Sequence, residues 1–231
     1  VYYFVSMWWG MSMKKVIGLL MILGLFSQAI FAGELKNMKL ILDKQGIKIW
    51  SYQVPKSSLY GFRAVTVVKS SLAGLVGLIT DTEHANRWLY RTSGIDVLQR
   101  SENNQSFTIR VVTDFPWPFT DREALVDVRI AQDLKTAKVR IDSNESPNAA
   151  SYPLKECCLR MPMVQGYWSF KPLANGMVEV TMSGHADPGG RIPATAVNFL
   201  ILEHPYNTLK GLRKILCEPS YQKLQYVFMC V

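Results

Sequence analysis

The stretch Ala186–Leu216, ADPGGRIPATAVNFLILEHPYNTLKGLRKIL, decides how the rest of the chain must be arranged. Its first part, Asp187–Gly190, contains a proline and two glycines, which favour a sharp turn over a continuing strand. Pro193 then stands where the first turn of a helix tolerates a proline, because that position needs no backbone donor. From Ala194 onward, apolar residues recur every three or four positions, as one buried helix face requires. We therefore predict a turn and a long helix that lies over an apolar surface, with Pro205 kinking the helix rather than ending it.

Length and composition indicate one globular domain with a sizeable core. The chain has 231 residues, of which 48% are hydrophobic and 19% charged, and this excludes a disordered chain. The formal net charge of +8 would suit an anionic partner. Because the basic residues are scattered and do not cluster beside stacking aromatic residues, nucleic-acid binding is not expected. The sequence also lacks the common nucleophile, zinc and phosphate-binding motifs, so we expect no catalysis, no metal and no cofactor.

The N-terminal region has the three parts of a secretory signal peptide. Met13–Lys15 is a short basic region, Val16–Phe26 is an apolar run, and small residues follow. The apolar run is shorter than the ~20 residues that a membrane-spanning helix needs. We predict a signal peptide over residues 1–32, with cleavage after Ala29 as one alternative and an uncleaved anchor as another. Residues 1–10 are interpreted as an over-extended start. The expected location is the periplasm or the exterior of the cell.

The four cysteines would then lie in an oxidising compartment, where disulfides form. Cys157 and Cys158 are adjacent, Cys217 follows the long helix, and Cys230 lies near the end of the sequence. Adjacent cysteines rarely bridge each other, so a bond from one of them to Cys217 or Cys230 is the expected pairing. The sequence itself does not choose among the pairings, and buried free thiols are an equal alternative.

The sequence pattern in the middle of the chain predicts mostly strands. Two early helices are expected over Glu34–Leu42 and Leu72–Ile79, and a third from Thr80 or Asp81 to about Trp88. Alternating apolar and β-branched residues predict strands at Ile47–Tyr52, Phe62–Lys69, Ile95–Arg100, Ser106–Thr113, Ala124–Ala131, Thr136–Asp142, Val164–Phe170 and Met177–Gly184. Antiparallel strands followed by one long final helix describe an α+β fold in which a curved sheet holds a helix.

Three motifs, in this order, resemble the signatures of START domains, the lipid-transfer modules of the helix-grip superfamily. They are Asp114–Glu123 (DFPWPFTDRE), Arg160–Met161 with Gly166–Pro172 (GYWSFKP), and Asp187–Pro193 with Asn198, Pro205 and Leu209–Arg213. The resemblance extends from about Leu35 to Leu216. It implies a START-like lipid-binding domain over residues 33–217, followed by a C-terminal tail over residues 218–231.

The resemblance implies an α+β helix-grip fold: a curved antiparallel sheet wrapped around a long C-terminal helix, with a hydrophobic tunnel between them. Such a protein would bind one lipid or sterol-like molecule and carry it across an aqueous compartment. It would touch a membrane surface transiently, act as a monomer, and use the C-terminal helix as a lid hinged at Asp187–Gly190. The alternatives are a polyketide cyclase-like enzyme of the same superfamily and an interaction module that transfers no ligand.

Apolar residues that share one face of a strand or of the final helix are the expected lipid contacts. They are Phe107, Ile109, Val111, Val126, Trp168, Phe170, Val180, Met182, Val197, Leu200 and Ile201. An ordinary core shows the same alternation, so their role as tunnel lining rests on the resemblance.

One charged residue, Arg129, is also predicted to bind lipid, because some START domains keep a buried arginine on this strand. An ungapped alignment places Val128 there instead, and a one-residue bulge would be needed to bring in Arg129. An exposed pair of Arg129 with Asp127 is the alternative. His185 and His204 are interpreted as packed or surface histidines rather than ligand contacts.

Overall fold

The structure is a computed structural model that describes residues 38–55 and 57–222. From Lys39 onward these residues belong to one compact unit. The predicted signal peptide over residues 1–32 and Cys230 lie outside the described residues. Within the described ranges, no helix is both long enough and apolar enough to cross a membrane.

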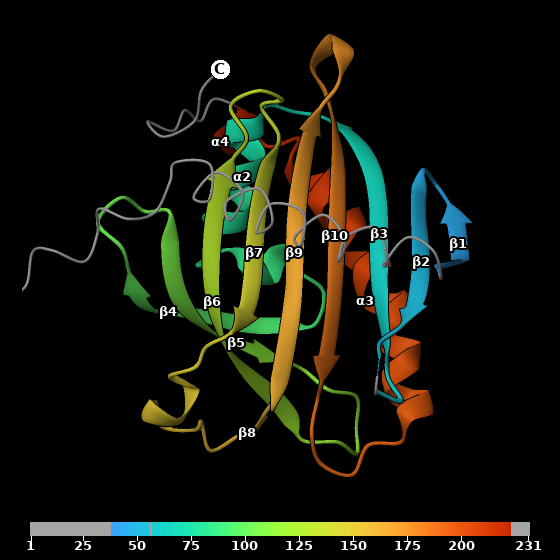
Figure 1. The fold of residues 1–231 in the computed structure, drawn as a ribbon, viewed down its shortest axis with the longest axis vertical. Helices are drawn as coiled ribbons and strands as arrows, with labels where there is room; N and C mark the ends of the chain where they lie inside the picture. Colours follow the sequence, from blue (N-terminus) through green and yellow to red (C-terminus); the bar gives the residue numbers. More distant parts are fainter. Residues whose placement is uncertain (1–37, 56, 223–231) are drawn as a thin grey trace, which may run out of the picture. The chain divides into compact units, whose positions relative to one another are not determined.

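A single curved sheet of ten strands dominates the fold (Figure 1). Its spatial order is β1-β2-β3-β10-β9-β7-β6-β5-β4, all antiparallel, and β8 pairs in parallel with β6. Among the described strands, β1 and β4 are the two edges, so the sheet does not close into a barrel. The strands are β1 (Lys39–Lys44), β2 (Ile47–Gln53), β3 (Tyr60–Lys69), β4 (Thr92–Arg100), β5 (Ser106–Thr113), β6 (Asp121–Gln132), β7 (Val139–Glu145), β8 (Cys158–Arg160), β9 (Met163–Pro172) and β10 (Met177–Asp187).

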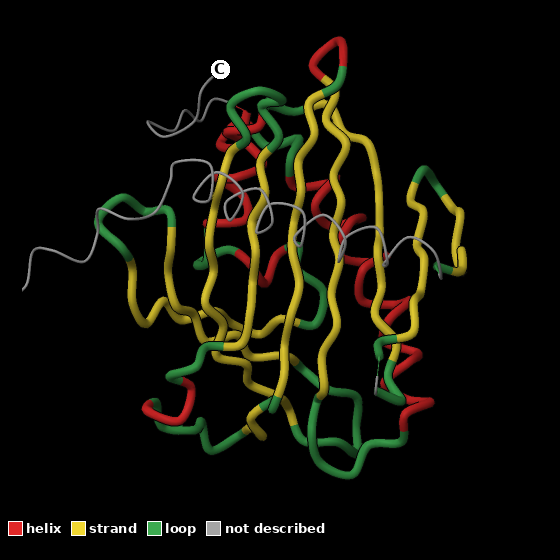
Figure 2. The backbone as a smooth tube through the Cα atoms, viewed as in Figure 1, coloured by secondary structure: helices red, strands yellow, loops and turns green. Residues whose placement is uncertain are grey.

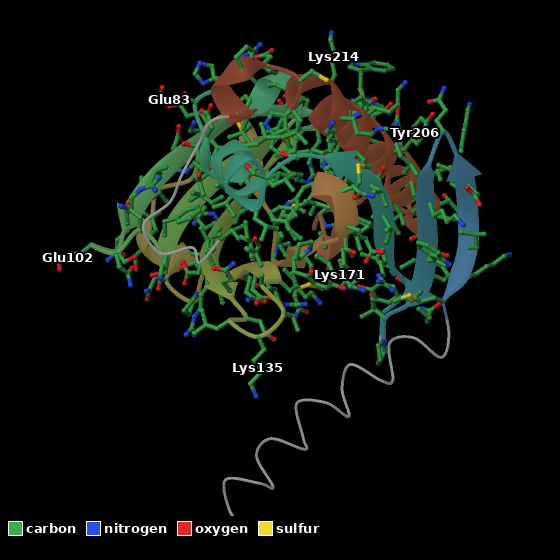
Figure 3. All side chains as sticks on the ribbon, turned by 90° about the horizontal axis from the view of Figure 1, so that it is seen from above. Glu83, Glu102, Lys135, Lys171, Tyr206 and Lys214 are labelled. Atoms are coloured by element: carbon green, nitrogen blue, oxygen red, sulfur yellow. A yellow bond between two sulfur atoms is a disulfide. The ribbon has the colours of Figure 1, made fainter. Side chains whose placement is uncertain are left out.

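The α-helices gather on the concave side of this sheet (Figures 2 and 3). Seen from above, the strands curve around the long helix α3 and the shorter α2 (Figure 3). The helices are α2 (Leu72–Thr80), α3 (Ala194–Ile215) and α4 (Pro219–Gln222), and the short 3-10 helices are η1 (Ala85–Arg87), η2 (Ala149–Ser151) and η3 (Ala174–Gly176). The predicted fold class, a curved antiparallel sheet wrapped around a long C-terminal helix, is confirmed.

The turn and helix of the opening stretch form as the sequence predicts. Gly189 and Gly190 adopt φ values of 64° and 72°, a left-handed conformation that glycine adopts without a steric penalty. Pro193 is the N-cap of α3, and the helix continues through Pro205. Helix α2 begins after Ser71, whose side chain caps it by accepting a hydrogen bond from the Gly74 N–H at 2.9 Å.

Two local predictions are wrong, and one short strand was not predicted. Lys39–Lys44 forms β1 rather than the end of a helix over Glu34–Leu42, because the turn at Gln45 and Gly46 folds it back onto β2. The helix expected up to Trp88 is reduced to η1. The three-residue strand β8 carries too short a pattern to predict.

The predicted disulfide is also wrong. Cys157 and Cys158 are bonded to each other. Cys217 is an exposed free thiol at the end of α3, whereas Cys158 is buried on β8 beside β6. Cys217 therefore belongs to a different part of the domain, and the pairing expected from sequence does not form.

The core lies between the sheet and the C-terminal half of α3. Leu209 and Leu212 are completely buried there, and Ile215 is 4% exposed. Packing continues past residue 217, because Tyr221 of α4 is buried in the same core and donates its hydroxyl to Asp81 at 2.6 Å. Burial and this hydrogen bond raise the pKa of Tyr221 to about 12. The segment predicted as a tail thus begins with a packed helix.

Candidate functional site

A cavity of about 330 Å³ lies between the concave face of the sheet and α3. Side chains from most of the strands and from the N-terminal half of α3 border it, and the majority are aliphatic or aromatic. Trp88 and Trp168 meet edge to face on its wall, with ring centroids 6.0 Å apart. Its volume is at the lower end of the ~300–1,000 Å³ that small-molecule sites usually occupy. The site is therefore a largely apolar chamber under the helix.

Most of the predicted lipid contacts border this cavity, and their contact with a ligand stays a prediction. They are Phe107, Ile109, Val111, Val126, Trp168, Met182, Val197, Leu200 and Ile201.

Three predicted contacts lie elsewhere. Phe170 and Val180 have no exposed surface and pack in the core away from the cavity wall. Arg129 is exposed, because β6 pairs with β5 and β7 in regular register and has no bulge there. The strand alternation therefore turns Val128 inward and Arg129 outward. Asp127 accepts a hydrogen bond from the Thr108 hydroxyl at 2.7 Å.

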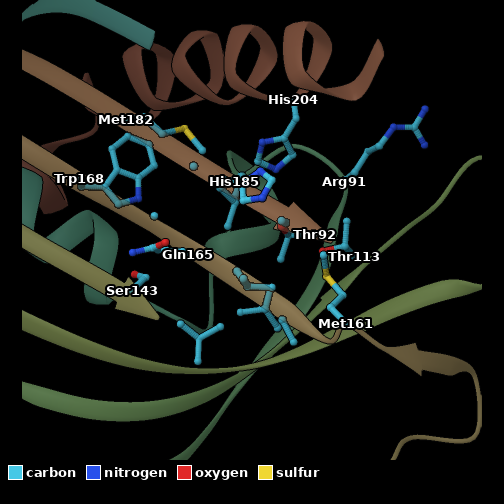
Figure 4. A pocket seen from close by; sticks show the side chains of 18 of the residues that line it. Arg91, Thr92, Thr113, Ser143, Met161, Gln165, Trp168, Met182, His185 and His204 are labelled. Carbon is cyan, nitrogen blue, oxygen red and sulfur yellow. The ribbon is translucent and has the colours of Figure 1, made fainter. Parts of the chain in front are cut away.

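A polar end of the cavity was not predicted. It consists of Thr92, Thr113 and His204, which border the cavity together with Arg91 (Figure 4). Thr92 and Thr113 are register partners on β4 and β5, and His204 reaches in from α3. The one available signal was that Thr113 shares a strand face with Phe107, Ile109 and Val111, since they alternate along β5. We define these three residues, Thr92, Thr113 and His204, as the polar end.

Electrostatics keep His204 uncharged. Burial lowers its pKa from 6.5 to about 4, and the nearby Arg91 guanidinium acts in the same direction, whereas Glu203 opposes the shift. Glu203 itself accepts the Tyr90 hydroxyl at 2.7 Å and lies 3.9 Å from Arg91 Nε. This hydrogen bond raises the pKa of Tyr90. At neutral pH the imidazole therefore has one N–H donor and one acceptor nitrogen.

The low pKa of His204 predicts a loss of stability in mild acid. The unfolded chain protonates this histidine below about pH 6.5, whereas the folded chain does so only near pH 4. The free energy of unfolding therefore decreases by at most about 3 kcal/mol as the pH falls between these values. Urea unfolding from pH 7 to pH 4 should show a shallower pH dependence for His204→Gln than for the wild type. Equal slopes would contradict the assignment.

His185 borders the cavity from β10 and is 8% exposed. Within the described residues, neither of its ring nitrogens has a hydrogen-bond partner. Its interpretation as a packed histidine rather than a ligand contact stays a prediction.

A buried arginine anchors the turn that precedes α3. Arg122 is 2% exposed and donates from Nε to the Pro188 carbonyl at 2.7 Å and from Nη2 to the Gly189 carbonyl at 3.3 Å. Its Nη1 donates to the Thr120 carbonyl, and the Phe115 ring lies 4.9 Å from its Cζ. Burial lowers the pKa of Arg122. The buried arginine of this strand is therefore Arg122, and it binds the turn rather than the cavity.

Its neighbour Glu123 is completely buried in a second charged cluster. Arg160 donates to Glu123 from Nε at 2.8 Å and also from Nη2, and the backbone N–H of Lys155 donates at 3.1 Å. Arg110 lies 3.5 Å away. The carboxylate thus joins β6 to β8 and to the loop before it.

Comparisons with known proteins agree with this geometry. No protein-family model matches the chain. An uncharacterized protein of Pseudomonas aeruginosa is 29% identical over 178 residues, which cover 77% of this chain and 86% of that protein. The phosphatidylcholine transfer protein of Bos taurus is 21% identical over 187 residues, which cover 80% of this chain and 85% of that protein.

Two solved structures show the same fold. The STAR-related lipid transfer protein of Xanthomonas axonopodis superposes with a TM-score of 0.72 at 26% identity, over 79% of this chain and all of that chain. Human StAR-related lipid transfer protein 5 superposes with a TM-score of 0.73 at 12% identity, over 88% of this chain and 98% of that chain. The chain is therefore similar in fold to StAR-related lipid transfer domains, the resemblance that its three motifs predict.

Proposed function

We propose that the protein binds one lipid or other hydrophobic molecule in the cavity and carries it across an aqueous compartment, with α3 as the lid. The observation that carries this proposal is the cavity itself, whose walls are the apolar concave face of the sheet and the N-terminal half of α3. The names of the Xanthomonas and bovine relatives, both lipid-transfer proteins, support the same function.

Such a carrier works by shielding apolar surface from water. Burying a hydrocarbon chain stabilises the complex by ~0.8 kcal/mol per CH₂ group. A closed cavity therefore holds its ligand in water and must open where the ligand enters or leaves. Transfer of this kind requires only ligand binding and opening of the cavity, so it needs no catalytic group.

The opening segment is the N-terminal half of α3. Val197, Leu200 and Ile201 border the cavity, whereas Leu209 and Leu212 further along the helix are locked in the core. The turn at Asp187–Gly190 precedes this half and supplies the hinge. We expect the helix to lift at its N-terminal end while its C-terminal end stays packed.

The loop between β5 and β6 is the proposed point of membrane contact. Phe115 borders the cavity, and Trp117, two residues later, is 93% exposed. Tryptophan side chains favour the interface between lipid and water. A fully exposed tryptophan beside the cavity thus suits a transient contact with a bilayer. Together with the predicted signal peptide, this supports transfer between membranes in the periplasm or outside the cell.

Ligand occupancy is the direct test. The protein is purified from its native cells and extracted with organic solvent. Mass spectrometry of the extract should identify one class of lipid, in a near-stoichiometric amount. Protein that releases no lipid and takes up none from vesicles would instead favour an interaction module.

Locking the lid should abolish transfer. The Tyr60 N–H donates to Asn198 Oδ1 at 3.2 Å, so the pair Tyr60→Cys and Asn198→Cys places two thiols at the junction of β3 and α3. Both the variant and its parent would carry Cys217→Ser to remove the exposed free thiol. We expect transfer of a fluorescent lipid between vesicles to fall at least tenfold when the new disulfide forms, while preloaded lipid stays bound.

Reductant should restore transfer in the locked variant and leave the parent unchanged, which controls for reduction of the Cys157–Cys158 bond. Full transfer by the oxidised variant would show that α3 is not the lid.

A further inference from the structure

We propose that the polar end of the cavity selects a ligand with one uncharged hydrogen-bonding head, a hydroxyl or carbonyl group, over a ligand with a phosphate headgroup. This inference rests on the proposed function and deepens it, because it names the class of molecule carried. It is argued from the three side chains of the polar end, Thr92, Thr113 and His204.

These side chains converge on one place in the cavity. Thr92 and Thr113 face each other across β4 and β5 and therefore lie on the same face of the sheet. Thr92 is only 6% exposed. His204 comes down from α3 on the opposite wall (Figure 4). Two hydroxyls and an imidazole thus lie together at one end of a chamber whose walls are mostly apolar.

Their hydrogen-bonding capacity is not used within the described part of the chain. Neither threonine hydroxyl nor the His204 ring has a hydrogen bond to another described side chain or backbone group, and the His204 ring meets the Tyr90 ring with centroids 6.5 Å apart. Buried polar groups are normally satisfied. A ligand head that both donates and accepts, or that accepts from a hydroxyl, would satisfy them.

The polar end has no charge to offer an anion. His204 is neutral at neutral pH, and threonine hydroxyls do not ionise. Arg91 also borders this end, but its guanidinium extends toward the rim (Figure 4), and the Glu203 carboxylate, 3.9 Å from its buried Nε, offsets its charge. Asp114, which also borders the cavity, adds a carboxylate. A buried phosphate without a paired cation is strongly disfavoured.

The volume of the cavity also favours a ligand with a small polar head. A cavity of about 330 Å³ is small among ligand sites. It suits one chain or one ring system that ends in a single polar group. The structure therefore favours a long-chain alcohol, a sterol-like alcohol or a neutral monoacyl compound as cargo.

The test compares three probes with the same hydrocarbon chain: tetradecanol, tetradecane and tetradecylphosphocholine. Binding to the full chain is measured by displacement of a fluorescent fatty probe at pH 7. We expect tetradecanol to bind at least tenfold more tightly than tetradecylphosphocholine. Tighter binding of the phosphocholine would overturn the inference and leave the proposed function standing. Binding of none of the three would overturn both.

Variants of the polar end show whether it is responsible. Thr92→Val, Thr113→Val and His204→Phe should each weaken tetradecanol binding about three- to tenfold, the effect of one lost hydrogen bond, and leave tetradecane binding unchanged. His204→Gln, which keeps a donor and an acceptor, should retain most of the affinity. The control is Thr108→Val, since Thr108 lies on β5 but on the opposite face and donates to Asp127.

Equal losses for tetradecanol and tetradecane in the polar-end variants would show a packing effect and overturn the inference. Thermal melting of each variant separates a weaker ligand contact from a partly unfolded domain, because a contact effect requires an unchanged melting temperature.

Discussion

Replacement of Glu123 by alanine is expected to lower the free energy of unfolding by about 3–5 kcal/mol. The carboxylate is completely buried and accepts hydrogen bonds from Arg160 and from the Lys155 backbone, with Arg110 3.5 Å away. Without it, Arg160 loses its buried carboxylate partner, and Arg110 keeps only Asp96, 3.7 Å from its Nη1. Removing one partner of a buried ion pair costs far more than the pair contributes on its own.

Urea unfolding at pH 7 measures this effect. Glu145→Ala is the matched control, because Glu145 is an exposed glutamate on the neighbouring strand β7 and should change stability by less than about 0.5 kcal/mol. Glu123→Gln should fall between the two, since it keeps a carbonyl acceptor for Arg160. If Glu123→Ala cost no more than the control, the buried cluster would have no structural role.

Replacement of Arg122 by methionine should both destabilise the domain and accelerate ligand release. Methionine fills the same space but leaves the carbonyl groups of Thr120, Pro188 and Gly189 without their donor. Hydrogen bonds to a charged group contribute ~1.5–3 kcal/mol each, and they are not additive, so we expect a loss of about 3–5 kcal/mol. Because two of these carbonyls belong to the proposed hinge before α3, release of a preloaded fluorescent lipid should become at least tenfold faster.

Arg129→Met is the matched control, since Arg129 lies on the same strand, β6, but is exposed. It should leave both stability and the release rate close to those of the wild type. A release rate unchanged in Arg122→Met, despite lower stability, would show that the hinge does not limit opening.

The elements that could be predicted are those whose pattern is long. Ten residues of β3 and twenty-two of α3 repeat their period often enough to identify strand and helix. Lys39–Lys44 shows the limit, because six residues fit either period and only the turn at Gln45 and Gly46 decides. The bond between Cys157 and Cys158 shows another, since spacing alone could not reveal that Cys217 lies elsewhere.

The candidate site likewise has one part that the sequence predicts and another that it does not. Its apolar walls follow from alternation, as Phe107, Ile109 and Val111 show on β5. The prediction that Arg129 faces the cavity required a one-residue bulge in β6. The strand has no bulge there, and sequence alone cannot show whether one is present. The polar end could not be predicted, because Thr92 and His204 are more than a hundred residues apart and meet only once α3 is packed across the sheet.

Helix α3 is anchored at its far end by a very close contact. A Cβ atom on Gly211 would overlap the carbonyl oxygen of Trp88 and lie 3.0 Å from its carbonyl carbon, so the two backbones touch. Under the proposed function, folding and cargo choice therefore depend on different halves of one helix. Changes at Val197, Leu200 and Ile201 can reshape the cavity while Leu209 and Leu212 keep the domain folded. A scaffold divided in this way can acquire new cargoes through mutation without first losing its structure.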